Sequence, residues 1–465
     1  MECKMLDGGT MKVPFCNLLT LLQGCYAEGN YFADLLNQLH AMRPSSLQAP
    51  WHGILYADEV HPGNQLSSSG RKTWAIYFSW LQMTPKLLSD ERNWFTLMVL
   101  RSDLVARLEA GIGQCIRILL ERLFGGSTNP QHGVALRSDT SRLRLYFTLQ
   151  MFLQEEIKLS AKFLTRASCH VATDEEVLSS WDRLKVKEAS LTKGKFKEWQ
   201  QATGWTYSSQ ALLMSETLRS LHVLKPITQY AFDWMHGLCS NGILNYVIYW
   251  TLQALKEAAM GDVWRRLCDY MKLWCWPLHV SQKAGCVAHL FEDKAVKGHN
   301  KDQKLRCSAS DILSLHQPLR HFLLRCCKAL PCDLARRACL SWLRVLEILL
   351  HAPVRLPNPG ELLACVEEAL QLCVDAAWSD GLVPKFHWSL HFEDQVQRFR
   401  AAPSCYTMVR KHKHVRKYGS GIANTRTYES TILQEITCDH VTHLTRDQKC
   451  MLTPTLWTRI PCLRS

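Results

Sequence analysis

The sequence lacks a hydrophobic run long enough to cross a membrane. Its longest candidate, residues 243–255, contains Asn245 and Gln253 and falls short of the ~20 apolar residues that a bilayer requires. The apolar stretch from Val13 to Leu22 is interrupted by Asn17, and it lacks both the basic residues and the cleavage pattern of a signal peptide. These absences predict a soluble protein that is neither secreted nor inserted into a membrane.

Close pairs of cysteines with metal-binding spacing are also missing. The 20 cysteines are spread through helical patterns of a long chain, so we expect reduced thiols rather than a disulfide scaffold. One region does contain the ligand types of a zinc site: Cys326, Cys327, Cys332, Cys339, His316 and His321. Its spacing does not form two pairs, and cysteine is common in helical cores, so packing is the favoured interpretation.

Positive charge, in contrast, is abundant. The net charge is +13 in 465 residues, of which 47% are hydrophobic. A chain of this size and composition can form two or three cores, and its charge indicates an anionic partner, with nucleic acid first. The densest cationic run consists of Arg410, Lys411, Lys413, Arg416 and Lys417. This run is either a solvated helix face or a phosphate contact.

Three strand patterns follow one another: the first begins at Trp51 and runs up to Asp58, and the others cover residues 73–80 and 94–100. Each is rich in β-branched, aromatic and aliphatic residues, and polar turns separate them. The first leads into the adjacent carboxylates Asp58 and Glu59. Consecutive strands with an acid at the end of the first are typical of RNase H-like nucleases, although an ordinary hairpin sheet gives the same pattern.

A helix, a further strand and a long helical region complete the pattern. Apolar spacing predicts one helix from Ser102 to Leu123, and residues 142–154 predict a fourth strand that leads into Glu155. Residues 208–260 and 263–376 are helical in pattern. In a ribonuclease-H topology the first and fourth strands lie side by side, which would bring Asp58 and Glu155 together.

The order of several short passages resembles the cut-and-paste DDE transposases of the CACTA and plavaka-like type, especially degenerate transposase-derived copies. The passages are Leu55–Asn64, Leu153–Glu155, Phe232–His236, Lys385–His391, and Arg410–Lys413 with Asn424–Arg426. The resemblance implies an α/β fold in which helices flank an RNase H-like mixed sheet and a large all-α insertion interrupts it.

The resemblance also implies an organisation for the whole chain. We expect an N-terminal helical segment at 1–50, the first part of the RNase H-like core at 51–235, and a helical insertion at 236–383. The core would return at 384–445, and a tail would follow at 446–465.

In this family, carboxylates hold two divalent ions, usually Mg²⁺, for in-line phosphoryl transfer. The resemblance therefore implies that Asp58 and Glu155 are catalytic metal ligands, with Asp233 as a substitute for Glu155. Glu59 and His236 would be accessory residues. Asp233 and His236 match an accessory Asp-x-Met-His element.

Two departures from the family pattern indicate impaired catalysis. The third acid should directly precede the basic run, but Val409 occupies that position, and only Glu429 or Glu435 could replace it. A Cys-x-x-Cys pair after the second acid is reduced to Cys169-His170.

We therefore expect a nuclear, DNA-binding, transposase-derived protein with a degenerate Mg²⁺ site. An active Mg²⁺-dependent strand transferase or nuclease and a helical protein-interaction scaffold are the alternatives. The sequence leaves homo-oligomerisation and DNA specificity open.

Overall fold

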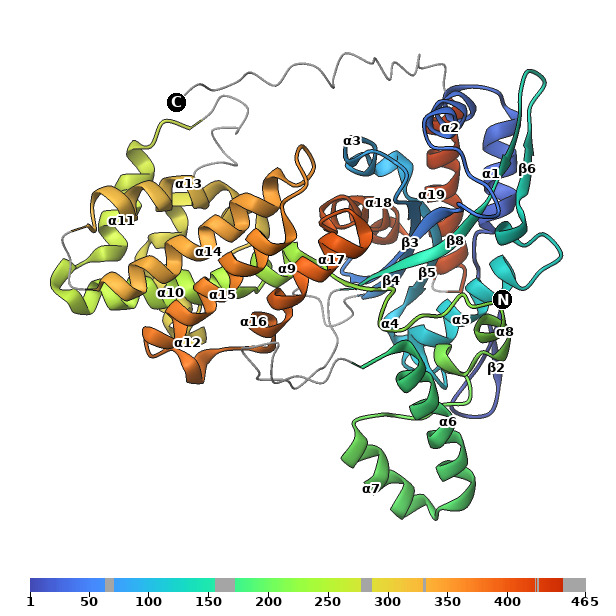
Figure 1. Ribbon diagram of the computed structural model, residues 1–465, viewed down its shortest axis with the longest axis horizontal. Coiled ribbons are helices and arrows are strands. Elements are labelled where there is room, and N and C mark those ends of the chain that lie inside the picture. The colour runs from blue at the N-terminus through green and yellow to red at the C-terminus, as the bar shows by residue number, and fades with distance from the viewer. Residues whose placement is uncertain are drawn as a thin grey trace. The chain divides into compact units, whose positions relative to one another are not determined.

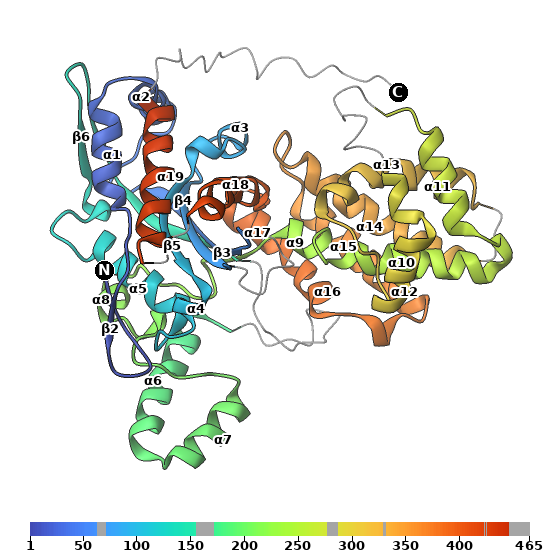
Figure 2. The same ribbon diagram turned by 180° about the vertical axis from the view of Figure 1, so that it is seen from behind.

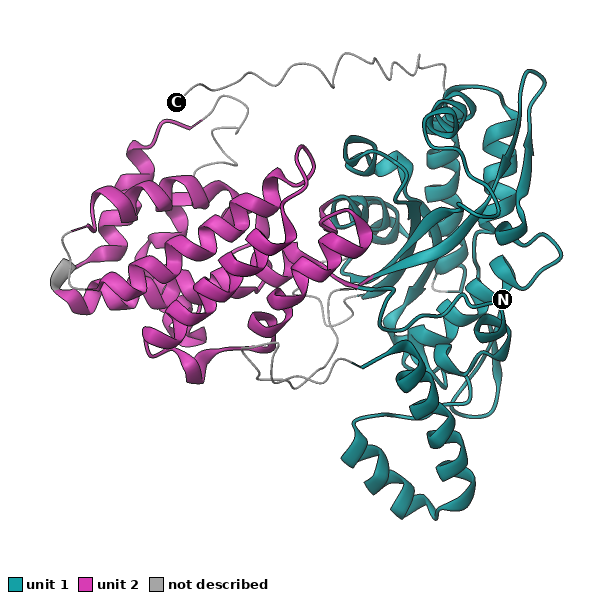
Figure 3. Ribbon diagram, viewed as in Figure 1, with its two compact units in different colours: residues 1–152, 172–230, 407–465 teal, residues 153–171, 231–406 magenta. Residues whose placement is uncertain are grey.

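The chain folds into two compact units, one inserted into the other (Figure 3). The structure is a computed structural model that describes residues 1–62, 71–154, 172–276, 287–328, 332–422, 424 and 426–445. Unit 1 comprises residues 1–152, 172–230 and 407–465, and unit 2 comprises residues 153–171 and 231–406. Residues 384–406, which the sequence assigned to the returning core, thus belong to unit 2.

A five-stranded mixed sheet forms the centre of unit 1 (Figure 1). Its spatial order is β5 (Phe95–Arg101), β4 (Thr73–Trp80), β3 (Trp51–Val60), β8 (Phe147–Gln154) and β9 (Tyr230–Phe232). β4 pairs antiparallel with both β3 and β5. The predicted α/β class with a mixed sheet and flanking helices is confirmed, and β3 lies between β4 and β8, as expected for the first and fourth strand patterns.

The side chains of β3 alternate between two buried faces of the sheet. Leu55 and Ala57 belong to the large hydrophobic core of unit 1. Tyr56 and Asp58 lie on the other face, because successive residues of a strand point to opposite sides. Burial on both faces explains why β3 reads as a nearly continuous apolar run. Asp58 is thus presented from a buried strand, on the face away from the main core.

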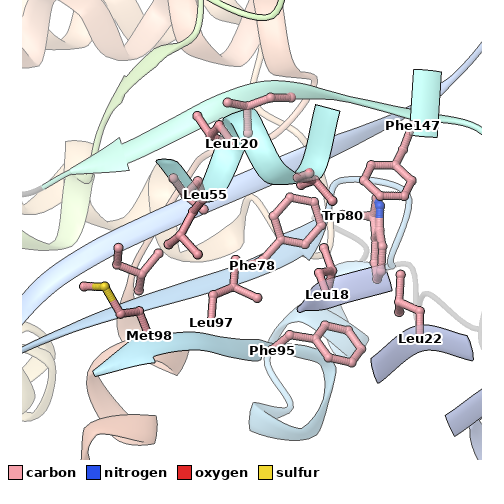
Figure 4. Packing of buried hydrophobic residues seen from close by; sticks show 14 of the residues in the cluster. Leu18, Leu22, Leu55, Phe78, Trp80, Phe95, Leu97, Met98, Leu120 and Phe147 are labelled. Carbon is pink, nitrogen blue, oxygen red and sulfur yellow. The ribbon is translucent and has the colours of Figure 1, made fainter. Parts of the chain in front are cut away.

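Aliphatic and aromatic side chains pack together in the main core (Figure 4). The Trp80 ring makes edge-to-face contacts with Phe78, Phe95 and Phe147, at centroid distances of 5.3, 5.7 and 5.6 Å. Such pairs contribute about 0.5–1.5 kcal/mol each beyond the burial of their area. They connect β4, β5 and β8, so the position of β3 in the sheet is fixed from both sides.

Helices cover the β5 side of the sheet. α19 (Tyr428–Thr445) packs against β5 and also contacts α1 (Leu18–Ala27) and α2 (Tyr31–Met42), as both views show (Figures 1 and 2). The Asn30 side chain donates a 2.7 Å hydrogen bond to the carbonyl of Thr445. The C-terminal end of α19 is thereby tied to the N-terminal helices.

The predicted single helix from Ser102 to Leu123 is wrong, because two helices occupy this stretch. α4 (Ser102–Val105) ends early, and α5 (Gly111–Phe124) begins at a glycine with φ of 54°. The backbone between α4 and α5 instead forms hydrogen bonds with the N-terminal hairpin, which consists of β1 (Glu2–Lys4) and β2 (Thr10–Lys12). Leu108 bridges Met5 there, so tertiary pairing overrides the helical periodicity.

The predicted strand at 142–154 is also two elements. β7 (Arg142–Leu145) pairs with β6 (Val134–Arg137) in a separate hairpin, whereas β8 joins the central sheet. The purely helical interpretation of 208–260 missed β9, a strand of three residues. A strand of three residues leaves no periodic signal in the sequence. Beside it, the Phe152 amide donates a 2.8 Å hydrogen bond to the Gln229 carbonyl.

Three further helices of unit 1 lie between β8 and β9: α6 (Asp174–Ser190), α7 (Lys193–Thr203) and α8 (Glu216–Ser220). Unit 1 also contains the short α3 (Pro85–Leu88). α7 has no buried residue, so its lysines lie on a solvated face.

Unit 2 is built from helices. They are α9 (Trp234–Leu238), α10 (Ile243–Leu255), α11 (Val263–Leu273), α12 (Asp293–Asp302), α13 (Ala309–Arg325), α14 (Asp333–His351), α15 (Pro359–Asp375), α16 (Pro384–Trp388) and α17 (Phe392–Phe399). α10 packs against α14, and α14 against α15. No helix within the described ranges is long and apolar enough to span a membrane.

Candidate functional site

Asp58 is largely buried near the end of β3, with 13% of its side chain exposed. Its Oδ2 accepts a 2.7 Å hydrogen bond from the Tyr56 hydroxyl, and its Oδ1 accepts one of 2.6 Å from the Glu59 amide. His412 Nε2, on α18 (Tyr406–Gly421), lies 3.8 Å from Oδ2. The group that faces Asp58 from this helix is therefore an imidazole.

Two tyrosines stack with His412 beside the carboxylate. The His412 ring lies 5.7 Å from the Tyr77 ring and 6.4 Å from the Tyr56 ring. Tyr77 is fully buried, and its hydroxyl has no hydrogen-bond partner in the described part of the chain. Burial, and then the negative charges of Asp58 and Glu91, raise the pKa of Tyr77 well above its usual value. Tyr77 is therefore a neutral phenol.

The other acids near this edge of the sheet are held by their own partners. Glu59 forms an ion pair with Lys72 at 3.2 Å and accepts a hydrogen bond from the Ser102 hydroxyl. Glu429 is buried and pairs with Arg101 at 2.6 Å. Burial alone would lower the pKa of Arg101, but the hydrogen bond and charge of Glu429 raise it. Glu429 is thus a structural anion and does not replace the missing third acid.

The described residues around Asp58 do not by themselves form a two-magnesium centre. Mg²⁺ requires near-octahedral oxygen ligands at about 2.0–2.1 Å. Among the described residues, Asp58 belongs to no group of three close metal-ligating side chains, and an imidazole faces it. Val409 lies three residues before His412 on α18, so the two share a helix face. Glu155, Cys169 and His170 lie outside the described residues.

Four of the five predicted DNA-contacting residues lie at the surface of α18. Arg410 donates to the Ser89 carbonyl at 2.7 Å, and Lys413 pairs with Glu91 at 2.9 Å. Lys417 lies 3.4 Å from Asp439, and Arg416 is exposed. Exposed pairs of this kind contribute little to stability, so these cations can be exchanged for phosphate contacts.

Lys411 differs, because it is buried, with 4% exposed. Its Nζ donates to the Glu91 carbonyl at 2.9 Å. Burial lowers the pKa of Lys411 to about 7, although the charges of Glu91 and Asp90 oppose the shift. Lys411 therefore does not face solvent phosphate.

Lys411 lines a cavity of about 550 Å³ within unit 1. The lining comes from the segment before β5, from α18 and from α19: Lys86, Ser89, Asp90, Glu91, Arg92, Lys411, Lys413, His414, Ile436, Asp439, His440 and His443. Burial lowers the pKa of both His414 and His440, and Lys411 adds to each effect. The wall therefore combines neutral imidazoles with ion-paired acids.

Asp233 and His236 lie together in unit 2 with a third residue, Cys405. Asp233 is the N-cap of α9, and it accepts hydrogen bonds from the amides of Met235 and His236 at 3.1 and 3.0 Å. The Cys405 amide and thiol donate to its two oxygens at 3.0 and 2.8 Å. Asp233, His236 and Cys405 are all buried.

The environment of Asp233 favours its ionised form. Burial alone would raise the pKa of the carboxyl, but the hydrogen bond and charge of His236, and then the Cys405 thiol, hold it below its usual value. The three ligand atoms lie within 4.8 Å of one another, so this group could hold a metal ion. Its sulfur and nitrogen do not indicate Mg²⁺, which prefers oxygen.

The segment Lys385–His391, which the resemblance also implicates, contacts this group through Lys385. Lys385 is buried, and its Nζ donates to the carbonyls of His236 and Ser240 at 3.1 Å each. It thereby fixes the last turn of α9. His387 and His391 face each other at 3.3 Å.

Sequence reasoning missed Cys405 and His412 as site residues. Cys405 is 172 residues from Asp233, so no local spacing connects them. His412 lies inside the basic run, and its position opposite Asp58 depends on the helix phase. The cysteines and histidines around Cys326 and Cys339, for which the sequence favoured packing over metal binding, form no three-residue metal cluster within the described ranges.

Compared with models of known protein families and with curated proteins, the chain matches none.

Proposed function

We propose that the protein is a transposase-derived, DNA-binding protein whose phosphoryl-transfer site is catalytically impaired. The observation that carries the proposal is the arrangement around Asp58. A carboxylate on the middle strand of a mixed sheet faces a helix that brings an imidazole and, on its outer side, exposed cations.

The strand order supports the RNase H-like part of the proposal. In that topology, three consecutive strands pair as neighbours and the fourth returns beside the first. Here β3, β4 and β5 are antiparallel neighbours, and β8 lies next to β3. β8 ends at Gln154, directly before Glu155 in the sequence, and the helical unit follows β9 and precedes α18. This is the order that the resemblance implies.

The charges near Asp58 support impairment. A two-metal mechanism requires several carboxylates that share ions. Glu59 and Glu429 have cationic partners, and His412 occupies the helix face opposite Asp58. A protonated imidazole there would repel a divalent cation, and a neutral one would offer a nitrogen that Mg²⁺ binds poorly. The alternative of an active Mg²⁺-dependent nuclease therefore needs ligands beyond the described residues around Asp58.

The exposed cations of α18 support binding to the DNA backbone. Arg410, Lys413, Arg416 and Lys417 point outward, and their surface contacts exchange at low cost. Contacts with phosphate release counterions, so affinity should fall steeply with salt. A partner of this kind implies a nuclear location.

The test is the affinity of the full chain for a random-sequence duplex, measured by fluorescence anisotropy over a range of salt concentrations. We expect the triple variant Arg410→Ala, Lys413→Ala, Arg416→Ala to reduce the slope of log K against log salt by about 2–3, because each lost phosphate contact removes ~0.9 from it.

The matched control also removes three exposed cations, Lys193, Lys195 and Lys197 on α7. This control variant should keep most of the wild-type slope of log K against log salt. Equal losses in both triple variants would show that binding follows net charge alone, and absence of salt-dependent binding in the wild type would favour a protein-interaction scaffold.

A further inference from the structure

Asp233, His236 and Cys405 direct three ligand atoms at one point inside unit 2. The sulfur of Cys405 lies 2.8 Å from Oδ2 of Asp233 and 3.0 Å from Nδ1 of His236. Oδ2 and Nδ1 are themselves in direct contact. The exposed fractions of the three residues are 3%, 6% and 0%. Three potential ligand atoms therefore lie in mutual contact at one buried point.

Without an ion, the thiol and Nδ1 can each direct one hydrogen to Oδ2 of Asp233. A cation would replace these hydrogens and accept lone pairs from all three atoms, and the mutual distances of the three atoms allow this.

We propose that Asp233, His236 and Cys405 bind one Zn²⁺ ion that fastens the two ends of the helical unit together. Thiolate and imidazole ligands favour Zn²⁺ over Mg²⁺. One carboxylate, one thiolate and one neutral imidazole balance the two positive charges, so the complex is neutral, as a buried site requires. Binding releases the thiol proton to solvent, and solvent supplies the fourth ligand.

The ligands are already held close to the positions that the ion needs. Zn–N distances of about 2.0 Å and Zn–S distances of about 2.3 Å place tetrahedral ligand atoms about 3.3–3.6 Å apart. Small outward shifts of the side chains provide this spacing. The amides of Met235, His236 and Cys405 orient the Asp233 carboxylate, and Lys385 fixes the end of α9. Such supporting contacts are typical of metal sites.

The position of the ligands in the chain gives the ion its role. Asp233 and His236 lie at the start of the continuous part of unit 2, residues 231–406, and Cys405 lies at its end. A bond between them closes a loop of more than 170 residues, since 172 positions separate Asp233 from Cys405. Links across long loops remove the most conformational entropy from the unfolded chain. The ion would thus stabilise the insertion, whether or not the protein binds DNA.

The test is the metal content of the full chain, purified with zinc supplied during expression and then dialysed against a weak chelator. We expect about one Zn²⁺ per chain by mass spectrometry of the metals, since no other three-ligand group occurs in the described part of the chain. Cobalt in place of zinc should give the ultraviolet absorption of a cobalt–thiolate bond. Wild-type protein that is folded and contains less than a tenth of an equivalent of zinc would overturn the proposal.

Variants locate the ion. Cys405→Ser and His236→Gln should each lose the zinc and the cobalt–thiolate absorption. The control is Cys339→Ala, which removes another buried thiol of unit 2 and should keep both. Retention of zinc by Cys405→Ser would contradict the assignment. If either ligand variant fails to fold, a strong chelator added to the wild type must lower its melting temperature by several degrees, and no shift would count against the ion.

Discussion

Asp58 in unit 1 and Asp233 in unit 2 show two ways to accommodate a carboxylate inside a protein. Asp233 receives hydrogen bonds from three amides, a thiol and an imidazole, all within its own unit. Asp58 receives one from Tyr56 and one from the next amide, and His412 lies 3.8 Å away. The partners of Asp233 compensate its charge, whereas Asp58 has room for another partner.

The difference separates structural from functional groups. A buried charge with many hydrogen bonds stabilises its surroundings, and only a ligand that displaces protons from these partners can bind to it. A charge with few partners is poorly stabilised in the free protein, and it gains more from an added ligand. Unit 1 contains the second kind: Asp58, Lys411 and the outer cations of α18.

The largest expected effect concerns the two carboxylates directly. Asp233→Ala should lower the free energy of unfolding by about 3–5 kcal/mol, because it leaves buried donors without their acceptor. Asp58→Ala should cost about 1 kcal/mol, because it removes fewer hydrogen bonds. Urea titration followed by circular dichroism measures both. Equal costs for the two variants would remove the distinction between the sites.

The pH dependence of stability tests whether Lys411 is an incompletely compensated charge. Its pKa of about 7 in the fold lies below the ordinary value of 10.5, so between these values the unfolded chain binds more protons than the folded one. The free energy of unfolding should therefore rise with pH between about 7 and 10.5. The contribution of Lys411 to it is lost as the pH falls toward 7.

Lys411→Met should remove this pH-dependent contribution to the free energy of unfolding. The difference in unfolding free energy between wild type and variant should change by up to about 1.4 kcal/mol per pH unit between pH 7.5 and 9.5. This range lies above the ordinary pKa of His414 and His440, whose pKa values are lowered. A difference that is independent of pH would show that Lys411 is protonated in the fold throughout.

The smallest effect concerns the helix face opposite Asp58. His412→Glu should create a pair of carboxylates there, and millimolar Mn²⁺ should then stabilise the variant by about 1 kcal/mol. Val409→Glu, at the position that the family pattern indicates, should gain less if His412 still faces Asp58. Melting temperatures with and without Mn²⁺ measure both. A larger gain for Val409→Glu would mean that position 409, and not His412, faces Asp58.

The parts of the fold that local pattern controls could be predicted from the sequence. β4 covers Thr73–Trp80, the bounds that its apolar pattern indicates, and α14 (Asp333–His351) lies inside the region 263–376 that is helical in pattern. The parts set by distant contacts could not. The break before Gly111 depends on pairing of Leu108 with Met5, and β9 is a strand only because it lies beside β8.

The candidate sites follow the same rule. Asp58 and the Asp233-x-x-His236 pair are visible because their neighbours in sequence are informative. Cys405 contacts Asp233 only once the helical unit has folded. Lys411 is buried while its basic neighbours are exposed, because it lies on a different face of α18. Burial and long-range convergence are properties of the folded chain, so residue type alone did not reveal them.

The proposed function holds that unit 1 binds DNA as a transposase-like core does but lacks its chemistry. Nicking of supercoiled plasmid in Mg²⁺ or Mn²⁺ tests this, at protein concentrations that anisotropy shows to saturate the DNA. We expect wild type and Asp58→Ala to bind the plasmid and to give the same background rate of nicking. Nicking by the wild type that requires metal and exceeds that of Asp58→Ala by tenfold or more would contradict it.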